Sequence, residues 1–500
     1  MSDRGLKAFL RRLEKDGELQ RVKTPVDPRL EVTEIVTRVV REQGPALLFE
    51  KVKGSDIPLV MNVFGTEDRM ARALEAPSLD AAADRIRQLV NPAVPTGFAA
   101  LGDALSRLGY LRHVPPKKVR EAPCQAVVLQ GDDVDLDLLP GVHAWPEDGG
   151  KFLNIGITHT RHPETGQRNV GMYRLQQHDK RTLGLHWQIH KDSTAHHALA
   201  ERRGERLPVA IAFGPEPALT YAASAPLPNG IDEYMFAGML QQARVEQVDC
   251  VSVPLQVPAN SQVVLEGWLE PGRRLPEGPF GDHTGFYTPV EPFPALTIDT
   301  ITMQQRPVFP SIVVGRPPQE DGPIGLATER LFLPLLQMVL PEIVDYHLPS
   351  TGVFHNCCIV SIDKRYPKHA QKVMNGIWGV PHLLWLSKVV VVVDADCDVH
   401  DYTDVAWRAF GNVDFGHDLL TTEGPVDHLD HASYDQFWGV KVGLDATAKL
   451  PQEGYRRDGG WPRMITQDPA VVDLVTRRWK EYGLKGLTGR HLNSGSVQRG

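Results

Sequence analysis

The sequence predicts a multi-domain protein of the α/β (α+β) class with a strand-rich central domain. First, 500 residues exceed one small domain and favour two or three. Second, the middle of the chain carries many short apolar segments bounded by Gly, Pro, Asp and Asn, which is typical of strands. Third, helical periodicity and short apolar strands alternate toward both ends, as they do in α/β units.

Residues 1–115 are expected to form a small α/β unit. Apolar residues recur at helical spacing over 6–13, and Gly17 is suited to end that helix. A second helix is expected over 31–42. The strands expected in this unit lie at 46–50 and 58–65.

Residues 116–320 are expected to form the strand-rich domain. Strands this dense, with one helix expected to interrupt them over 232–243, predict a barrel or a folded sheet. The expected strands lie at 125–131, 152–160, 169–177, 183–190, 209–214, 263–270, 296–304 and 310–315.

Residues 321–485 are expected to form a second α/β domain, and residues 486–500 a loose polar tail. The domain opens on a helical pattern over 327–346. After it come a strand at 357–363, a helix at 368–378 and the five valines 389–393, which indicate a buried strand.

Composition and charge exclude several classes of protein. The net charge of −8 and the lack of Lys/Arg runs argue against nucleic-acid binding. The five cysteines form no CxxC pair, so neither a disulfide framework nor a zinc ribbon is indicated. The N-terminus is charged and lacks the apolar core of a signal peptide, and the longest apolar run is too short to span a membrane. A cytoplasmic protein without a transmembrane segment is expected, and a peripheral contact with a membrane is compatible with this composition.

The segment RNVGMYRLQQHDKRTLGLHWQIHKD (168–192) gathers polar side chains beside apolar strands. Asn169 and Arg174 have opposite parity, so one strand presents both on the same face only if a bulge or turn intervenes. His186 and His190 share parity, as metal ligands on a strand could, but no Glu follows His186 as in a metalloprotease helix. The alternative is that these residues are the polar side chains of a half-exposed sheet.

Glu233, in LPNGIDEYMFAGML, is expected in the first turn of a helix. It is either a carboxylate favoured there by the helix dipole or an oxygen ligand of a divalent cation. An Asn carbonyl, a His nitrogen and a Glu carboxylate suit Mn²⁺ or Mg²⁺ better than a structural zinc ion. Because such cations usually also bind phosphate oxygens, a phosphorylated cofactor is a natural partner.

Three common motifs are missing from the sequence. It has no GxGxxG after a strand, no GxxxxGK[ST] and no GxSxG. Their absence argues against a nicotinamide enzyme, an ATPase and a serine hydrolase.

The stretch EGPFGDHTGFY (277–287) carries Glu277 and Asp282 in a setting of Gly and Pro that predicts a sharp bend. It is either a simple turn or a bend that projects two carboxylates into a cleft. With an Arg nearby, one carboxylate could stay ionised while the other delivers a proton.

Several long motifs, taken in order, resemble the UbiD family of reversible decarboxylases, which use prenylated FMN. The resemblance covers nearly the whole chain. It rests on GELQRVKTPVDPRLEVTEI, GPALLFE, NVFGT, NVGMYR, PLPNGIDEY, VVLEG, EGPFGDHTGFY, GRPPQED and VGLDATAK.

The resemblance implies a cofactor site. Asn169, His190 and Glu233 match the family's Mn²⁺ ligands, which hold the cofactor phosphate through the metal, and a K⁺ ion is implied near 223–226 and Glu233. The cofactor contacts that it implies are Asn169, Val170, Gly171, Met172, Tyr173, Arg174, Ile189, His190, Glu233 and Lys388.

The resemblance also assigns the catalytic residues. Arg174, Glu277 and Asp282 match the family's Arg–acid–acid network, with Asp282 as the proton donor and the other two orienting it and tuning its pKa. The last acid is Glu in some branches of the family, and the shorter Asp here leaves its reach to the substrate open.

The family's fold would place the flavin in a split β-barrel and use the C-terminal α/β domain for assembly into a homodimer or homohexamer. A separate UbiX-type prenyltransferase would supply the cofactor, and the substrate would be an aromatic or α,β-unsaturated carboxylic acid. The motifs GLHWQIHKDSTAHH and PLPNGIDEYMFAG favour the quinone-pathway branch, with a dihydroxynaphthoate of menaquinone biosynthesis first. A 3-polyprenyl-4-hydroxybenzoate of ubiquinone biosynthesis comes second, and a catabolic phenolic or heteroaromatic acid third.

Two alternatives come from other classes. One is a flavin-independent divalent-metal hydrolase that uses His186, His190 and Glu233. The other is a non-catalytic flavin-binding or scaffold protein.

Overall fold

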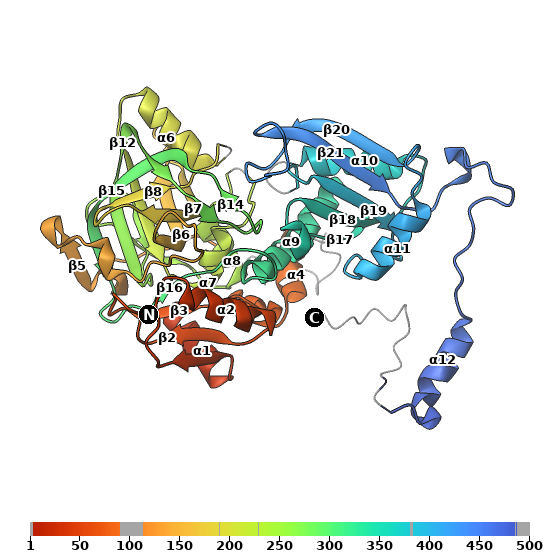
Figure 1. The fold of residues 1–500 in the computed structure, drawn as a ribbon, viewed down its shortest axis with the longest axis horizontal. Helices are drawn as coiled ribbons and strands as arrows, with labels where there is room; N and C mark the ends of the chain where they lie inside the picture. Colours follow the sequence, from red (N-terminus) through yellow and green to blue (C-terminus); the bar gives the residue numbers. More distant parts are fainter. Residues whose placement is uncertain are drawn as a thin grey trace, which may run out of the picture.

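The computed structural model describes residues 4–90, 114–189, 191–228, 230–380, 384–485 and 487. Three parts follow one another along the chain: an N-terminal α/β unit, a β-barrel with helices on its outside, and a C-terminal α/β domain (Figure 1). The long helix α9 (Asp321–Val339) lies between the barrel and the C-terminal sheet (Figure 1).

The two helices and two strands predicted in the N-terminal unit are present, and two further helices, α3 and α4, follow them. Helix α1 ends at Lys15, and Gly17 follows it with a φ of 79°, a left-handed conformation that favours glycine. The sheet order is β1-β2-β3-β16, so the last strand comes from the chain that leaves the barrel. The elements are α1 (Leu6–Lys15), β1 (Leu19–Val22), α2 (Glu31–Arg41), β2 (Ala46–Phe49), β3 (Leu59–Met61), α3 (Glu67–Ala73), α4 (Leu79–Val90) and β16 (Phe309–Pro310).

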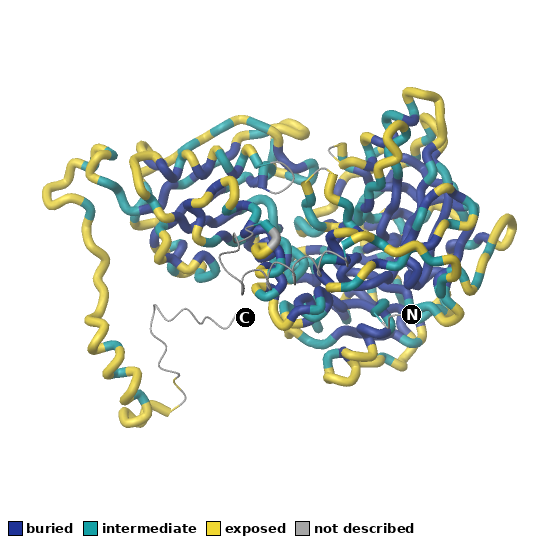
Figure 2. The backbone as a smooth tube through the Cα atoms, turned by 180° about the vertical axis from the view of Figure 1, so that it is seen from behind, coloured by how far each residue is buried: buried dark blue, intermediate teal, exposed yellow. Residues whose placement is uncertain are grey.

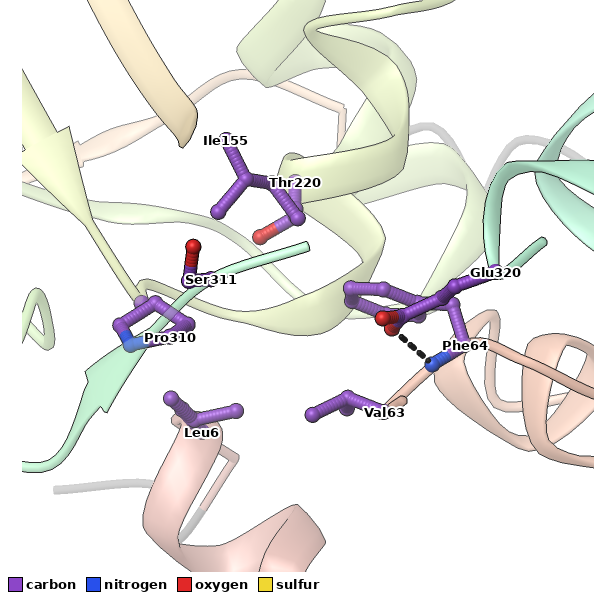
Figure 3. Close-up of a pocket in the computed structure, with 9 residues that line it drawn as sticks. Leu6, Val63, Phe64, Ile155, Thr220, Pro310, Ser311 and Glu320 are labelled. Carbon is purple, nitrogen blue, oxygen red and sulfur yellow. Dashed lines mark hydrogen bonds between the residues drawn. The ribbon is translucent and has the colours of Figure 1, made fainter. Parts of the chain in front are cut away.

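A buried carboxylate joins this unit to the chain that follows the barrel. Glu320 accepts hydrogen bonds from the backbone N–H groups of Asn62, at 2.8 Å, and Phe64, at 2.9 Å (Figure 3). Burial raises the pKa of Glu320 to about 7, although these hydrogen bonds oppose the rise. The start of α9 is therefore held in place by the N-terminal unit.

Six antiparallel strands close into the central barrel. Their order is β12-β9-β6-β7-β8-β15, and β15 pairs with β12 to complete the ring. The strands are β6 (Phe152–Arg161), β7 (Arg168–Gln177), β8 (Thr182–Leu185), β9 (Leu207–Phe213), β12 (Val263–Glu277) and β15 (Glu291–Met303), and β5 (Val127–Gln130) extends the sheet beside β15.

Alternation along the strands divides the barrel's core. In β9, Val209 and Ile211 pack in a cluster that takes residues from all six strands, including Leu175 and Leu265. Their neighbours, such as Ala210, belong instead to a second cluster with the outer helices and the N-terminal unit. Because β9 is buried on both faces, its sequence is a nearly continuous apolar run.

The barrel carries more helices than the single one predicted. Besides α8 (Glu233–Leu240), the structure has α6 (Asp192–Arg202) and α7 (Pro217–Ala222). Helix α6 escapes sequence patterning because the side chains that it buries include Ser193, His196 and His197, so no apolar stripe marks its inner face.

Two predicted strands are shorter than expected. The strand expected over 183–190 ends at Leu185, and that expected over 310–315 is reduced to the end of β16. Two small sheets complete the domain: β4 (Lys117–Lys118) with β10 (Glu246–Asp249) and β11 (Gln256–Pro258), and β13 (Phe280–Gly281) with β14 (Tyr287–Thr288).

The helix predicted over 327–346 is wrong at both ends. Helix α9 starts earlier, at Asp321, and ends at Val339, after which β17 (Ile343–His347) forms. Pro341 explains the break, since proline disfavours helical geometry in the residue before it, and Leu340 lies outside that geometry with a φ of −125° and a ψ of 74°.

The C-terminal domain is a five-stranded mixed sheet of order β17-β18-β19-β21-β20. The valine run is β19, a central strand buried on both faces as predicted: Val390 and Val392 pack in one cluster, Val391 and Val393 in another. The remaining elements are β18 (Cys357–Ile362), α10 (His369–Gly379), β19 (Val389–Asp394), α11 (Tyr402–Asn412), β20 (Leu419–Pro425) and β21 (Trp438–Asp445).

The chain then extends away from the body of the protein. Helix α12 (Pro469–Arg478) stands apart from the C-terminal domain, and most of this segment is exposed (Figure 2). Of the tail predicted over 486–500, only Leu487 falls within the described residues. Among the helices that the structure describes, none is long and apolar enough to cross a membrane.

Candidate active site

A cavity of about 570 Å³ lies where β7, the start of α9 and loops of the C-terminal domain meet. Six consecutive residues of β7, from Asn169 to Arg174, line it, together with Asp282, Asp321 and Glu233. From the C-terminal domain, the cavity is lined by Phe354, His355, Trp385, Leu386, Ser387 and Leu429.

A β-bulge on the neighbouring strand β6 lies beside Arg174. In the pairing of β6 with β7, Leu153 faces Leu175 and Gly156 faces Tyr173, so two residues of β6 stand opposite Arg174 alone. One of them, Ile155, has a φ of 61°, a left-handed conformation unusual for a branched residue. Asn169 and Arg174 both line the cavity although their parity differs, because residues of both parities between them line it too. The bulge is on β6 and does not change the parity of β7.

An ion pair brings Asn169 and Glu233 to one end of the cavity. Their sequence neighbours Arg168 and Asp232 are joined by bonds of 2.7–2.9 Å from the guanidinium to the carboxylate. Asp232 also caps helix α8, since it accepts a hydrogen bond from the backbone N–H of Tyr234 at 2.9 Å. The start of β7 is thereby fixed against the start of α8.

The side chains of Asn169 and Glu233 fit a bound cation. The amide nitrogen of Asn169 donates to Ser193 Oγ at 2.8 Å, which leaves its carbonyl oxygen as a ligand. Glu233 Oε2 is buried with no hydrogen-bond partner among the described residues, and burial raises the pKa of Glu233 to about 8. A cation at this carboxylate would satisfy the orphaned oxygen. The third predicted ligand, His190, lies outside the described residues, although its neighbours Gln188 and Lys191 line the cavity.

The other end of β7 carries the predicted catalytic residues, which the structure brings into one network. The Arg174 guanidinium binds Glu277 through two bonds, from Nε at 2.9 Å and from Nη2 at 3.1 Å. Its Nη1 donates to Asp282 Oδ2, and its Nη2 also donates to Thr288 Oγ1 at 3.0 Å. One arginine thus holds both carboxylates of the EGPFGDHTGFY segment.

The backbone of this segment aims the two acids. Glu277 ends strand β12 and Asp282 follows β13, which forms a hairpin with β14. Gly278 has a φ of 100° and Gly285 a φ of 83°, conformations that favour glycine at these two turns. The segment is therefore a turn, and it is also the support of a buried charge network.

Both carboxylates are held ionised. Burial alone would raise the pKa of Glu277, but the hydrogen bond with His186 and the charge of Arg174 lower it to about 2. Burial likewise opposes ionisation of Asp282, yet the charge of Arg174 and the hydrogen bonds from His283 hold its pKa below the ordinary value.

Further side chains lie in this network or beside it, and of these only His186 was named from the sequence, as a ligand in the metal-hydrolase alternative. His186 lies 3.0 Å from Glu277 Oε2 through Nδ1, and the nitrogen is also 2.9 Å from Arg174 Nη2. His283 contacts Asp282 Oδ1 through Nδ1 at 2.9 Å, and its Nε2 lies 3.0 Å from Nε2 of His355. Asp321 lines the cavity nearby, and burial raises its pKa to about 7.

A signal for two of these residues was present in the sequence. His283 and Asp321 belong to the motifs EGPFGDHTGFY and GRPPQED, whose other positions were used only for the resemblance. Nothing local distinguishes His355 or Thr288, because only the hairpin and the packing of the C-terminal domain bring them to the cavity.

Two predicted cofactor contacts lie apart from the cavity lining. Ile189 is 69% exposed. Lys388 forms an ion pair with Asp430 at 2.8 Å, next to the lining residues Ser387 and Leu429. Both remain predictions as cofactor contacts.

Comparison with known proteins shows which family has this fold and site. Three profiles of one family match in order: the 3-octaprenyl-4-hydroxybenzoate carboxy-lyase N-terminal domain over 10–89, the Rift-related domain over 117–317 and the C-terminal domain over 323–446. The chain belongs to the UbiD family. It is therefore a carboxy-lyase of the prenylated-FMN class.

Relatives across this family share the whole length of the chain. Uncharacterized proteins of Aquifex aeolicus and Archaeoglobus fulgidus are 45% and 46% identical over 96% of this UbiD-family chain and 99% of their own. The vanillic acid decarboxylase of Sedimentibacter hydroxybenzoicus in closed form superposes with a TM-score of 0.83 at 29% identity, over 96% of this chain and 98% of that one. The open form of the same enzyme superposes with a TM-score of 0.78.

A second solved relative contains the flavin. The UbiD-class enzyme HmfF of Pelotomaculum thermopropionicum, in complex with FMN, has a TM-score of 0.77 at 27% identity, over 94% of this chain and 98% of that one. An evolved dimeric form of HmfF is in complex with prenylated FMN. The predicted barrel fold of the UbiD class is confirmed by these structures.

Proposed function

We propose that this protein removes CO₂, reversibly, from an aromatic or α,β-unsaturated carboxylic acid, with prenylated FMN and Mn²⁺ in the barrel cavity. One observation carries the proposal. Strand β7 carries Asn169, which lines the cavity together with Glu233 of α8, and farther along Arg174, which holds two buried acids. The cavity between them is lined by backbone and side chains of the same strand.

The residues present fit the metal ion that would hold the cofactor. Asn169 through its carbonyl, Glu233 through its unpartnered oxygen and His190 would hold Mn²⁺, and the residues 223–226 that line the cavity beside Glu233 would contribute to a K⁺ site. When bound, prenylated FMN supplies the electron sink that protein side chains lack.

Arg174 has the first role in the reaction that we propose. Its guanidinium is the cation nearest to the acids in the cavity and is able to pair with the substrate carboxylate. When it does so, Asp282 shares that positive charge with a second anion, and its pKa rises from the low value that Arg174 imposes. Substrate binding thus prepares Asp282 to carry a proton.

His283 and Asp282 then move the proton. His283 Nδ1 lies 2.9 Å from Asp282 Oδ1, and although burial alone would lower the pKa of His283, the Asp282 carboxylate raises it. We infer that His283 protonates Asp282, which delivers the proton to the carbon that has lost CO₂. Glu277 stays ionised and holds Arg174 in place.

The substrate is proposed from the sequence motifs of the quinone branch. A dihydroxynaphthoate-type acid of menaquinone biosynthesis comes first, a 3-polyprenyl-4-hydroxybenzoate of ubiquinone biosynthesis second. A phenolic acid is the third candidate, and the similarity to a vanillic acid decarboxylase favours keeping it. Release of CO₂ from each acid by the flavin-loaded protein distinguishes the three.

The assembly that we propose is a homodimer or homohexamer. The segment around α12 lies apart from the rest of the protein (Figure 2). It exposes apolar residues, among them Ile465, which is 99% exposed, Val471 and Leu474. A second copy of the chain is a natural cover for such a segment. Light scattering of the full-length protein measures the oligomeric state.

We also propose a cytoplasmic location, which the five free thiols support.

The experiment that tests the function is co-expression with a UbiX-type flavin prenyltransferase, followed by anaerobic purification. We expect an absorbance spectrum of bound flavin, the mass of prenylated FMN in the released cofactor, and CO₂ release from at least one candidate acid. Protein that binds metal but no flavin under these conditions would overturn the proposal. It would favour the hydrolase alternative. One observation already argues against that alternative: Nδ1 of His186, one of its three metal ligands, contacts Glu277 and Arg174.

A further inference from the structure

A second cluster of metal-ligating side chains lies outside the barrel cavity. Among the residues that the structure describes, one group of three His, Cys, Asp or Glu side chains has all its ligand atoms within 4.8 Å of one another: Glu329, His347 and His400. They come from three elements: the middle of α9, the end of β17 and the loop before α11. None of the three lines the barrel cavity.

The two histidines converge on one carboxylate. His347 Nδ1 lies 2.6 Å from Glu329 Oε2, and His400 Nε2 lies 2.8 Å from Glu329 Oε1. The two rings stand with their centroids 4.5 Å apart. Two imidazole nitrogens and a carboxylate oxygen form the protein part of many zinc sites whose fourth position is open.

The outer nitrogen of each histidine also has an oxygen beside it. His347 Nε2 lies 2.9 Å from Tyr402 Oη, and His400 Nδ1 lies 3.4 Å from Asp398 Oδ1. Metal-bound histidines usually donate their second N–H to such an oxygen, which fixes the tautomer and the ring orientation. These two contacts therefore leave Nδ1 of His347 and Nε2 of His400 as the nitrogens that face inward.

The charge on Glu329 is available to a cation. Arg330 Nη2 approaches Glu329 Oε1 at 3.0 Å, yet the same nitrogen lies 2.6 Å from Asp345 Oδ1. Because Asp345 balances Arg330, the Glu329 charge is not neutralised by that arginine alone.

A metal ion can reach these side chains through a neighbouring cavity. His347, His400 and Tyr402 line a cavity of about 630 Å³, whose other walls include Thr66, Glu67 and Asp68 of the N-terminal unit and the start of α9. The side chains of His347 and His400 are 12% and 14% exposed, while Glu329 is fully buried. The ligand set thus has one closed side and one side that opens on the cavity.

We propose that Glu329, His347 and His400 bind a divalent transition-metal ion such as Zn²⁺, at a site separate from the cofactor site. The ion joins α9, β17 and the loop before α11, and so fastens the C-terminal sheet to the helix that leads from the barrel. The open coordination position faces the cavity and takes water or an anionic group. In the competing arrangement the two histidines only donate N–H groups to Glu329, and no ion binds.

The test uses the full-length, flavin-free protein carrying Glu233→Gln, which removes the predicted cofactor metal site. After dialysis against Zn²⁺, we expect one equivalent of zinc per chain by elemental analysis and a higher Tm, because an ion that binds only the folded state stabilises it. His347→Gln and His400→Gln in the same background should each lose the stoichiometric zinc. His417→Gln is the matched control, since this histidine of the same domain is 81% exposed and should leave binding unchanged.

A milder variant covers the case in which a histidine variant does not fold. Tyr402→Phe keeps the three ligands and removes only the oxygen beside His347 Nε2, so the zinc Kd by calorimetry should rise about 10–100-fold. Absence of a zinc equivalent in the Glu233→Gln protein would overturn the proposal. So would zinc binding that is retained in both histidine variants, or an unchanged Kd in Tyr402→Phe.

Discussion

The two ends of β7 hold buried carboxylates with opposite properties. At one end, Glu277 receives hydrogen bonds from Arg174 and His186, and its pKa falls to about 2. At the other end, burial raises the pKa of Glu233 to about 8, and its Oε2 has no hydrogen-bond partner among the described residues. Burial acts in the same direction on both, so the difference comes from the partners that the chain supplies.

The comparison separates two kinds of site. Where the chain provides its own cation, the carboxylate is a permanent anion, and it serves to hold Arg174 and tune Asp282. Where the cation that the chain supplies, Arg168, is bound to Asp232 instead, the carboxylate is costly when ionised until an external cation arrives. We therefore expect the Glu233 end to respond to metal and the Glu277 end to respond to substrate. The four predictions below test this division, from the largest expected effect to the smallest.

Asp282→Asn should abolish proton delivery without emptying the cofactor site. We expect the rate of CO₂ release to fall about 10²–10⁴-fold, the usual contribution of a general acid, while the flavin spectrum is retained. Asp282→Glu is the control, because it restores the acid with one more methylene and should recover part of the rate. An Asn variant that keeps the full rate would remove Asp282 from its proposed role.

Glu233→Gln should have the reverse pattern. It removes the negative charge that a cation would meet at the orphaned oxygen, so we expect Mn²⁺ and flavin retention to drop about tenfold or more. Elemental analysis and the flavin absorbance of purified protein measure both. If the variant kept its metal and flavin yet lost the rate, the two ends of β7 would not divide their tasks in this way.

The contribution of Glu233 to the stability of the metal-free protein should fall as pH rises. The folded pKa of Glu233, about 8, exceeds the unfolded value of a Glu, so its contribution is fully present below about pH 4.5 and is lost as pH rises toward 8. We expect this contribution to lose more than about 1.4 kcal/mol, the equivalent of one pKa unit, between pH 5 and 8. The difference between the wild type and Glu233→Gln isolates it, because buried histidines with lowered pKa values, such as His159 and His196, act in the opposite direction.

Glu320 and Asp321, with pKa values raised to about 7 by burial, add to this slope. Glu233→Gln should therefore remove only the part of the pH dependence that Glu233 contributes, and Mn²⁺ should change the pH dependence of the wild-type protein but not that of the variant. Denaturant titrations at four pH values measure the slope. A slope that is identical in the two proteins would contradict the raised pKa of Glu233.

Thr288→Val should have the smallest effect. It removes one hydrogen bond to Arg174 Nη2, at 3.0 Å, and leaves the bonds to both acids in place. We expect kcat/KM to fall by the equivalent of about 1 kcal/mol, close to fivefold. Thr288→Ser keeps the hydroxyl and should behave like the wild type, whereas a loss as large as that of Asp282→Asn would mean that Thr288 has a role beyond orienting Arg174.

The predictions made from sequence succeeded where one element decided the pattern. The five valines of β19, the helices α1 and α2 and most barrel strands follow from apolar periodicity and turn residues. They failed at α6 because packing overrode the pattern, since this helix buries polar side chains. They failed at the end of α9 because a local signal was not used: Pro341 ends the helix, and β17 follows. The site residues Arg174, Glu277 and Asp282 were named from motifs, and the structure brings all three together.

By itself, the sequence determined the three-part order of the chain, the family and the chemical types at the site, because these depend on local patterns and long motifs. Only the tertiary structure decided which carboxylate meets a cation of the chain and which does not. Burial and partners set those pKa values, and both arise from residues about a hundred positions apart in sequence, as Arg174 and Glu277 are. The cluster of Glu329, His347 and His400 is a further case, since no spacing in the sequence joins a helix, a strand end and a loop.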